Sequence, residues 1–349
     1  MRAVRSEYMH WAKSQAPVTY ALSSSEVPHF RLDRLPFAIS DLELDGASYH
    51  RYPPLRQAIA EKEGVDPACV VMADGTSMAN FLALAALIEP GDEVLVEFPV
   101  YEPLLAAARF LGAEVKRFER PGFALDPAAV ERAMSPATKL IVITNLHNPS
   151  GAFASPEALA AVGALGPRVL VDEVYLDSGP RPGSAFHLGP NFVCTSSLTK
   201  VYGLSGLRCG WILAEPDLAE RMWRLNEVMG VAQAHPAERL SCIALAHLDE
   251  IAAGREERLE RNRALFNAFL AGRSDLECAP MESGITAFPR LLRGDPEALN
   301  ALLRERFDTA IVPGRWFEMP DRFRVGIGQA TEIVEDGLAR LGAALDVLA

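Results

Sequence analysis

Cysteine is scarce in this sequence, and its cysteines stand alone. The five cysteines, an odd number, lie at positions 69, 194, 209, 242 and 278, and no two form a C-x-x-C pair. We therefore expect neither a disulfide framework nor a cysteine-type zinc site, and no cluster of histidine and cysteine indicates another metal site. Unpaired thiols suit a reducing compartment, so we predict a cytoplasmic protein without a bound metal.

Long apolar runs and runs of positive charge are also missing. The longest apolar stretch, 81–88, is too short to cross a bilayer, and the chain opens on a polar segment rather than an apolar signal region. Lysine and arginine number 34 against 46 aspartate and glutamate, which gives a net charge of -12. Because nucleic acid is itself a polyanion, we expect neither a nucleic-acid partner nor a membrane role.

What remains is a chain long enough for two domains. It has 349 residues, of which 49% are apolar. Residues 1–40 are interrupted by prolines and show little periodicity, so we predict an N-terminal arm associated with the smaller domain. Residues 41–240 are predicted to form a large domain, and residues 241–349 a small C-terminal domain.

Within the predicted large domain, apolar and often β-branched runs alternate with helical stretches. Strands are expected at 69–73, 93–97, 114–118, 139–144, 168–172, 191–196 and 208–214. This alternation predicts an α/β fold with a mostly parallel sheet covered by helices on both faces. Ligands of such sheets bind beyond the carboxyl ends of the strands, which is where Asn148, Asp172 and Lys200 are expected.

The pattern changes after residue 215. Helices are expected at 215–230, 235–252 and 254–271, then short strands near 285–291, 309–312 and 322–327, and a final helix from Thr331. This mixture of helices and short strands predicts a smaller α+β domain.

One lysine lies in a segment whose residue types are typical of Schiff-base formation and phosphate binding. Lys200 follows the hydroxyl-rich run 195–199 and precedes a glycine-punctuated stretch that leads to Arg208. A lysine amine forms a Schiff base with an aldehyde when its surroundings favour the neutral form. Ser197 and Arg208 are groups suited to a phosphate. Taken alone, Lys200 would be interpreted as a solvated loop residue.

Two earlier segments give this lysine a context. The run Leu-Val-Asp-Glu-Val-Tyr at 170–175 and the run Asn-Leu-His-Asn-Pro-Ser-Gly at 145–151 precede it. With the lysine segment, they match the Asn-Pro-[Ser/Thr]-Gly, Asp-x-x-Tyr and Ser-x-x-Lys…Arg motifs. From about residue 48 to the C-terminus the chain resembles the fold-type I aminotransferases of class I/II. The resemblance implies their PLP-dependent transferase-like fold and the cofactor pyridoxal 5'-phosphate (PLP). No G-x-G-x-x-G follows the first strand, which argues against a dinucleotide.

The resemblance implies a role for each residue near the cofactor ring. Lys200 would form the Schiff base and then act as the general base. Asp172 would pair with the pyridine nitrogen, since a carboxylate after a buried strand needs a partner; a helix cap or a loop ion pair would also supply one. Tyr175 and Asn148 would donate to the phenolic oxygen. Taken alone, the Asn-Pro-Ser-Gly run is a plain turn.

A second group is expected around the cofactor phosphate. Backbone N–H groups at the start of a helix suit a phosphate, although an ordinary glycine turn would have the same sequence. A hydroxyl and the planar fork of an arginine would complete this phosphate site. The residues concerned are Gly75, Thr76, Ser77, Ser197 and Arg208.

Aromatic side chains are implied on the ring and at a subunit interface. Tyr101 occupies the place of a family aromatic that stacks on the cofactor; an aromatic buried at a helix start is the competing interpretation. Tyr49 is the choice for a tyrosine that reaches the phosphate of a neighbouring subunit, and Tyr52 is its rival. The resemblance therefore implies a homodimer with shared active sites.

Arg324 lies in the run 322–328, where residues of a strand alternate between two faces. The resemblance implies that Arg324 binds the α-carboxylate of the substrate, although a solvent-facing strand arginine is the plain interpretation and Arg322 shares its face. No second arginine marks a dicarboxylic acid as the substrate.

These expectations favour an aminotransferase. It would move an amino group from an L-amino acid to a 2-oxo acid by a ping-pong mechanism through the Lys200 Schiff base. A PLP-dependent lyase acting by β-elimination, or a decarboxylase, stays open, because the same residues build a shared electron sink. The third hypothesis is a ligand-sensing domain without catalysis.

Overall fold

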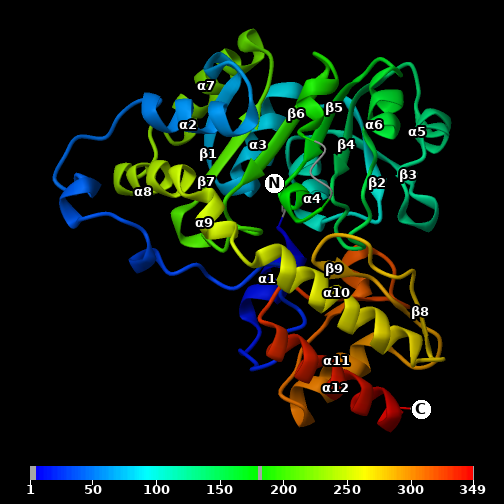
Figure 1. Cartoon of the computed structure of the whole chain (residues 1–349). Coiled ribbons are helices and arrows are strands. Elements are labelled where there is room, and N and C mark those ends of the chain that lie inside the picture. The colour runs from blue at the N-terminus through cyan, green and yellow to red at the C-terminus, as the bar shows by residue number, and fades with distance from the viewer. Residues whose placement is uncertain (1–4, 180–182, 349) are drawn as a thin grey trace.

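The computed structural model describes residues 5–179 and 183–348 and shows two packed parts (Figure 1). The larger part is built on a seven-stranded sheet of order β1-β7-β6-β5-β4-β2-β3. The strands are β1 (Val70–Asp74), β2 (Glu93–Phe98), β3 (Glu114–Glu119), β4 (Thr138–Thr144), β5 (Arg168–Asp172), β6 (Phe192–Ser197) and β7 (Cys209–Leu213). All seven form where the sequence predicts a strand.

The prediction of a mostly parallel sheet is confirmed. Strands β3, β2, β4, β5 and β6 pair in parallel, whereas β7 runs antiparallel to both β6 and β1. Because β4, β5 and β6 are parallel, their carboxyl ends meet at one edge of the sheet. Thr144, Asp172 and Ser197 are the last residues of these three strands.

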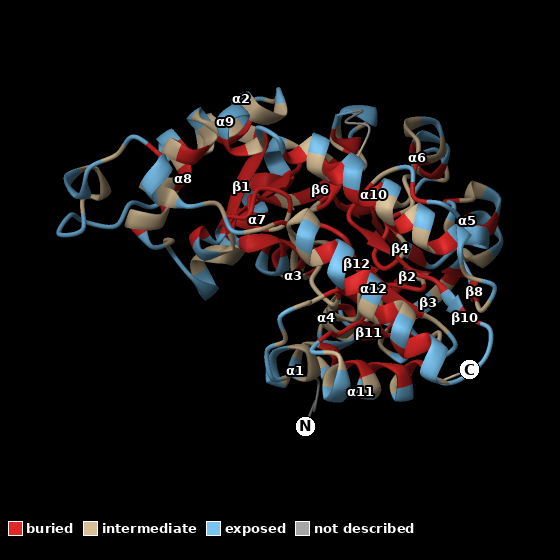
Figure 2. Cartoon of the chain, turned by 60° about the horizontal axis from the view of Figure 1, so that its bottom comes forward, coloured by how far each residue is buried: buried red, intermediate tan, exposed pale blue. Residues whose placement is uncertain are grey.

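Helices cover both faces of this sheet. Every residue of β7 is buried, and β4 is buried at every position but Lys139, which requires cover on both sides. Figure 2 shows the central strands of the sheet in red and helices around them whose outer sides are exposed. The helices of this part are α2 (Pro53–Glu63), α3 (Gly75–Leu87), α4 (Glu102–Phe110), α5 (Pro127–Ala133), α6 (Pro156–Gly163), α7 (Pro216–Met229), α8 (His235–Ala246) and α9 (Leu248–Ala252).

Local signals explain several helix boundaries. Asp126 accepts a hydrogen bond from Ala128 N at the start of α5, and Ser155 caps α6 in the same way. The helix predicted at 235–252 is wrong in one respect. It is divided at His247, whose φ of -119° and ψ of 24° separate α8 from α9.

The smaller part carries its own apolar core. Helices α10 (Arg255–Ala271), α11 (Pro296–Arg306) and α12 (Thr331–Leu348) pack beside strands β9 (Thr286–Ala287), β11 (Val312–Pro313) and β12 (Phe323–Gly326), which form a sheet of order β11-β12-β9. A second sheet pairs β8 (Leu276–Glu277) with β10 (Arg290–Leu291). Helix α10 spans both cores, because Leu259 belongs to the large apolar cluster and Phe266 to the small one. The domain boundary predicted at residue 240 stays a prediction.

The N-terminal segment is more ordered than the sequence suggests. It forms helix α1 (Glu7–Ser14), where Ser6 accepts a hydrogen bond from Met9 N. Ser6 also donates to the Glu102 carboxylate at the start of α4. Further along, Gly326 N of β12 donates to Leu22 O at 2.6 Å, so the arm is tied to both parts of the molecule. No helix of the described chain is long and apolar enough to cross a membrane.

Candidate active site

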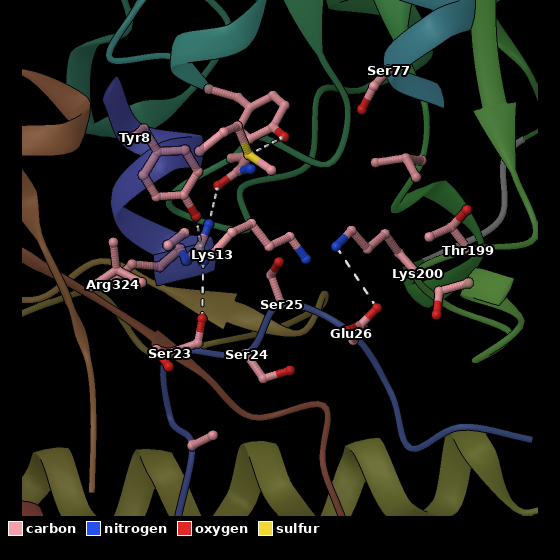
Figure 3. Close-up of a pocket in the computed structure, with 18 of the residues that line it drawn as sticks. Tyr8, Lys13, Ser23, Ser24, Ser25, Glu26, Ser77, Thr199, Lys200 and Arg324 are labelled. Carbon is pink, nitrogen blue, oxygen red and sulfur yellow. Dashed lines mark hydrogen bonds and ion pairs between the residues drawn. The ribbon is translucent and has the colours of Figure 1, made fainter. Parts of the chain in front are cut away.

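A cavity of about 590 Å³ opens at the carboxyl ends of β4 and β5. Its walls come from both parts of the molecule and from the N-terminal segment, as Figure 3 shows for Lys13, Lys200 and Arg324. The predicted site residues that line it are Thr76, Ser77, Tyr101, Asn148, Asp172, Tyr175, Lys200, Arg208 and Arg324. Residues far apart in the sequence are thus brought to one site.

The carboxylate of Asp172 lies at the bottom of this site. It is 5% exposed and accepts hydrogen bonds from Asn80 Nδ2 at 2.7 Å and Val174 N at 3.1 Å. Burial raises the pKa of Asp172 to about 6, because the charged form loses water. No cation of the described chain lies within ion-pair distance of it, so this carboxylate has room for a cationic N–H partner.

Asn80 links this carboxylate to the sheet. Thr195 Oγ1 in β6 donates to Asn80 Oδ1 at 2.6 Å, which turns the amide NH₂ toward Asp172. Asn80 is not among the residues predicted from the sequence. The available signal was a polar amide within the apolar helical run 78–88, since a buried amide needs hydrogen-bond partners.

Lys200 follows β6 and reaches into the cavity from the side of the large sheet. Its side chain is 31% exposed, and Nζ lies 3.8 Å from Glu26 Oε2. The amine is therefore accessible to a small molecule in the cavity.

Helix α3 begins at the cavity without a side-chain cap. Gly75 N donates to Arg208 O at 2.7 Å, but no side chain of the described residues satisfies the N–H groups that follow at Thr76 and Ser77. Gly75 has a φ of +75°, and a Cβ there would lie 2.5 Å from Arg208 Nη2, so only glycine leaves room for this guanidinium. The free N–H groups and the guanidinium together make a candidate anion site.

Hydroxyl groups surround this anion site. Thr76 Oγ1 donates to Ser197 Oγ at 2.8 Å, and Ser197 also accepts from Thr199 N at 3.2 Å. Ser197 is 1% exposed and stands behind Thr76 rather than in the cavity wall. Thr199 lines the cavity, and its buried Oγ1 hydroxyl has no hydrogen-bond partner within the described residues.

Arg324 enters the cavity from β12 of the smaller part. It is 1% exposed, and its guanidinium donates to Asn148 Oδ1 at 3.0 Å, Tyr8 OH at 3.1 Å and Ser23 O at 3.1 Å. All three acceptors are neutral, and no carboxylate of the described chain forms an ion pair with Arg324. Its positive charge is therefore available to an anionic ligand.

Arg322, the rival to Arg324, points elsewhere. Its Nη1 donates to Phe288 O at 3.0 Å, and its guanidinium stacks over the Phe123 ring at 4.9 Å. It does not line the cavity.

Two tyrosines flank the space between Asp172 and Arg324. Tyr101 donates from its hydroxyl to Met9 Sδ at 3.3 Å and meets the ring of Tyr8 edge to face, with centroids 5.9 Å apart. Burial raises the pKa of Tyr101 well above its ordinary value and that of Tyr175 to about 12. Both hydroxyls therefore stay protonated and able to donate near neutral pH.

The structure distinguishes the two interface candidates by exposure. Tyr49 is 46% exposed and does not line the cavity of its own chain. Tyr52 is 5% exposed, and its hydroxyl accepts from Arg239 Nη1 at 3.0 Å. Of the two, Tyr49 is the side chain exposed to other molecules, and its ring centroid lies 4.8 Å from that of His235.

The N-terminal segment forms a wall of the cavity that was not predicted from the sequence. Tyr8 and Lys13 of α1 and the run Ser23 to Glu26 line the cavity. One signal was present: Ser6 before Glu7, with Lys13 a turn or two later, has the charge pattern of a short capped helix. Among the described residues, no group of three or more His, Cys, Asp or Glu side chains could hold a metal ion.

Comparisons with known proteins show what this chain is similar to in sequence and in fold. A family model described as "Aminotransferase class I and II" matches residues 21–341. Capreomycidine synthase of Streptomyces vinaceus is 33% identical over 347 residues, covering 93% of this chain and 89% of the relative.

Solved structures share the whole fold. A PLP-dependent aminotransferase from Streptococcus suis 89-1591 superposes with a TM-score of 0.91 at 24% identity, over 100% of this chain and 99% of the other. The PLP-dependent cyclase OrfR superposes with a TM-score of 0.90 at 25% identity, again over 100% and 99%. The two-part architecture is thus shared by an aminotransferase and a cyclase.

Proposed function

Because the chain belongs to the aminotransferase class I and II family and uses PLP, we propose that it moves an amino group from an L-amino acid to a 2-oxo acid in a ping-pong cycle. One observation carries this proposal. Arg324, buried and without a carboxylate partner in the described chain, lines the same cavity as Lys200. The site can therefore bind the carboxylate of an amino acid in the same cavity that holds the Lys200 amine.

The residues of the site fit PLP. Asp172 lacks a cationic partner and would receive one from a pyridinium N–H. The uncapped start of α3 and Arg208 suit the phosphate, and the Thr199 hydroxyl, which lacks a partner in the described chain, would donate to it. Asn148 and Tyr175 would donate to the phenolic oxygen, and Tyr101 would lie against the ring.

PLP, when bound, supplies an electron sink that makes the proton on the substrate Cα removable. Lys200 would anchor the cofactor and then take that proton with its freed amine. Asp172 would keep the pyridine nitrogen protonated. Because Asp172 is buried and lies below the cavity, water competes poorly for this hydrogen bond.

Arg324 would orient the substrate. Its planar fork matches a carboxylate in two hydrogen bonds, and its contacts with Asn148, Tyr8 and Ser23 hold the fork in place before the substrate arrives. An amino acid held in this way keeps its α-carboxylate, which disfavours decarboxylation. Helix α1 would exclude water on this side of the cavity.

We extend the proposal to the assembly and its location. Tyr49 would donate to the phosphate bound by a second copy of the chain, which makes a homodimer the active form. The exposed ring of Tyr49 and the engaged hydroxyl of Tyr52 support this choice. The five unpaired cysteines suit the cytoplasm.

A second candidate function is elimination followed by ring closure. Two comparisons favour it: the relative at 33% identity is named a synthase, and the structure at 25% identity is named a cyclase. The candidate shares the first step, removal of the Cα proton, and differs in losing a group from the substrate Cβ.

The deciding experiment follows the absorbance of bound PLP and the products together. The purified protein is given single L-amino acids without an acceptor. For amino transfer, the absorbance of bound PLP falls, one equivalent of 2-oxo acid appears, and an added 2-oxo acid restores the signal. Persistent absorbance with repeated release of ammonia, water or a cyclic amino acid would instead identify the second function.

A further inference from the structure

A carboxylate faces the amine of Lys200 from the N-terminal segment, and the proposed function gives it no role. Glu26 Oε2 lies 3.8 Å from Lys200 Nζ, and its side chain is 28% exposed. No other carboxylate in the part of the chain that the structure describes lies within ion-pair distance of this amine. Figure 3 shows the two side chains meeting in the cavity from separate segments.

The backbone holds these two residues side by side. Val27 N donates to Lys200 O at 3.0 Å, and Phe30 N donates to Gly203 O at 3.0 Å. The segment after Glu26 therefore runs along the segment after Lys200. Gly203 has a φ of +67°, and a Cβ there would lie 2.2 Å from Pro28 O, so this approach requires glycine.

The smaller part of the molecule holds Glu26 from the other side. Gln329 Nε2 donates to Glu26 O at 2.7 Å and to Ser24 Oγ at 3.1 Å. A Cβ on Gly328 would lie 2.9 Å from Glu26 O, so the two backbones are in close contact. Attachment on both sides fixes the Glu26 carboxylate on the amine's side of the cavity.

Glu26 differs from the other charged groups that line the cavity. The cations that line it are Lys13 from α1, Arg208, Arg304 from α11 and Arg324; its other titratable groups are Asp172, Tyr8, Tyr101 and Tyr175. Asp172 is engaged by Asn80 and by Val174 N. Glu26 is thus the carboxylate of the cavity that is free to pair with an ammonium ion at Lys200.

We propose that Glu26 is a positioning residue for Lys200: its carboxylate holds the freed lysine, as the ammonium ion, on the side of the cavity where the substrate is bound. This inference rests on the proposed function, in which Lys200 takes the proton from the substrate Cα. A flexible lysine that has taken up a proton would otherwise turn toward solvent. Held by Glu26, it stays in reach of the atom to which the proton is returned.

The test compares Glu26→Gln, which keeps the shape and removes the charge, with Glu26→Asp, which keeps the charge. Glu335→Gln is the matched control, because it removes the same charge from an exposed position of α12. For Glu26→Gln we expect kcat to fall roughly 10-fold or more with KM nearly unchanged, since a misplaced proton carrier slows the chemical step. Glu26→Asp should recover part of the loss, and the control should match the unmodified protein.

A second readout does not depend on turnover. The absorbance of PLP bound to the holoenzyme is titrated against pH without substrate. Glu26→Gln removes a negative charge that stabilises the protonated, cationic form of the PLP-loaded site. The midpoint of this absorbance titration should therefore move down by about one pH unit. Melting temperature and PLP content, measured on each variant, show whether the fold and the loaded state are intact. If Glu26→Gln does not fold, Glu26→Asp is the test, because its shorter side chain draws the carboxylate away from the amine and should still lower kcat in part.

The outcomes separate the two proposals. An unchanged kcat and titration midpoint in Glu26→Gln, beside an inactive Lys200→Ala, would overturn the inference and leave the proposed function standing. A rise in KM alone would also overturn it, since Glu26 would then contact the substrate instead. Turnover by Lys200→Ala would remove the proposed function itself.

Discussion

The guanidinium of Arg324 donates to the side-chain oxygen of Asn148 at 3.0 Å, which joins the smaller part of the molecule to the loop after β4. Asn148 is held in turn, because its N–H donates to Thr144 Oγ1 at 3.1 Å. Thr144 Oγ1 donates to the buried Glu97 carboxylate at 2.6 Å. The orientation of Arg324 is thus set by a chain of hydrogen bonds that reaches into the large sheet.

The first prediction concerns Arg324. Replacing it with alanine should weaken amino-acid binding by about 2–5 kcal/mol, because a desolvated carboxylate loses its bidentate partner. Arg324→Lys keeps the charge but not the fork and should recover only part of the loss. The measurement is KM and kcat for one donor, with Arg322→Lys as the control; equal effects at both positions would contradict the assignment.

The second prediction concerns Lys200. Lys200→Ala should abolish turnover yet still bind PLP, now without a covalent bond, because Asp172, the start of α3 and Arg208 remain. Activity is measured on protein loaded with PLP, and denaturing mass spectrometry after borohydride reduction detects the covalent bond. Lys139→Ala, on the exposed position of β4, should behave like the unmodified protein. Normal activity in Lys200→Ala would remove the lysine from the mechanism.

The large sheet could be predicted because its strands carry their own signal. Buried parallel strands are continuous apolar runs, so segments such as 139–144 and 168–172 stand out between helical stretches. The polar residues that follow these runs had to converge, since parallel strands end at one edge. Asp172 and Asn148 were found in this way, with the resemblance to a known family adding their roles.

The N-terminal wall of the cavity could not be predicted in this way. Helix α1 has few residues, and its position depends on distant contacts such as Ser6 with Glu102 and Tyr8 with Arg324. Glu26 lies in no helix or strand, so no periodicity marks it. Its place beside Lys200 arises from backbone hydrogen bonds between segments far apart in the sequence, which leave no local pattern.

The third prediction uses the raised pKa of Asp172. Because burial raises this pKa from its ordinary value to about 6, the folded PLP-free protein binds the proton more tightly than the unfolded chain. The free energy of unfolding should therefore fall as the pH rises through the window from the ordinary pKa of an aspartate, 3.8, to about 6. Above about 6 it should level off.

Asp172→Asn tests this dependence. The PLP-free variant should be more stable than the unmodified protein by roughly 2–3 kcal/mol above the window, and the difference should vanish at low pH. Melting temperatures across the pH range, without and with PLP, measure it. Added PLP should reverse the order, since a pyridinium partner stabilises only the carboxylate. A difference independent of pH would show that Asp172 does not titrate there.

The fourth prediction separates the two interface tyrosines. Tyr49→Phe removes only the hydroxyl and should weaken PLP binding by about 1.5–3 kcal/mol, the contribution of a hydrogen bond to a charged group, while leaving the melting temperature of the PLP-free protein unchanged. Tyr52→Phe should instead lower the melting temperature, because Arg239 Nη1 loses one of its acceptors. PLP titrations are paired with light scattering, which reports the mass in solution. The opposite pattern would exchange the two roles.

The fifth prediction concerns the ion pair beneath the site. Arg120 Nη1 and Glu97 Oε2 lie 2.7 Å apart, and both side chains are 0% exposed. Arg120→Met should cost about 3–5 kcal/mol of stability, because it leaves a buried carboxylate without its cation.

The double variant Arg120→Met with Glu97→Gln should recover much of this loss, since it removes the buried charge as well. Burial already raises the pKa of Glu97, so the single variant should be less destabilised at acidic than at alkaline pH, where its carboxylate must carry a charge. Urea unfolding at two pH values measures both effects.

The same variants should also raise KM, because the Glu97 carboxylate holds Thr144 and, through it, Asn148 and Arg324. A stability loss without any change in KM would show that this hydrogen-bond chain does not orient the substrate arginine.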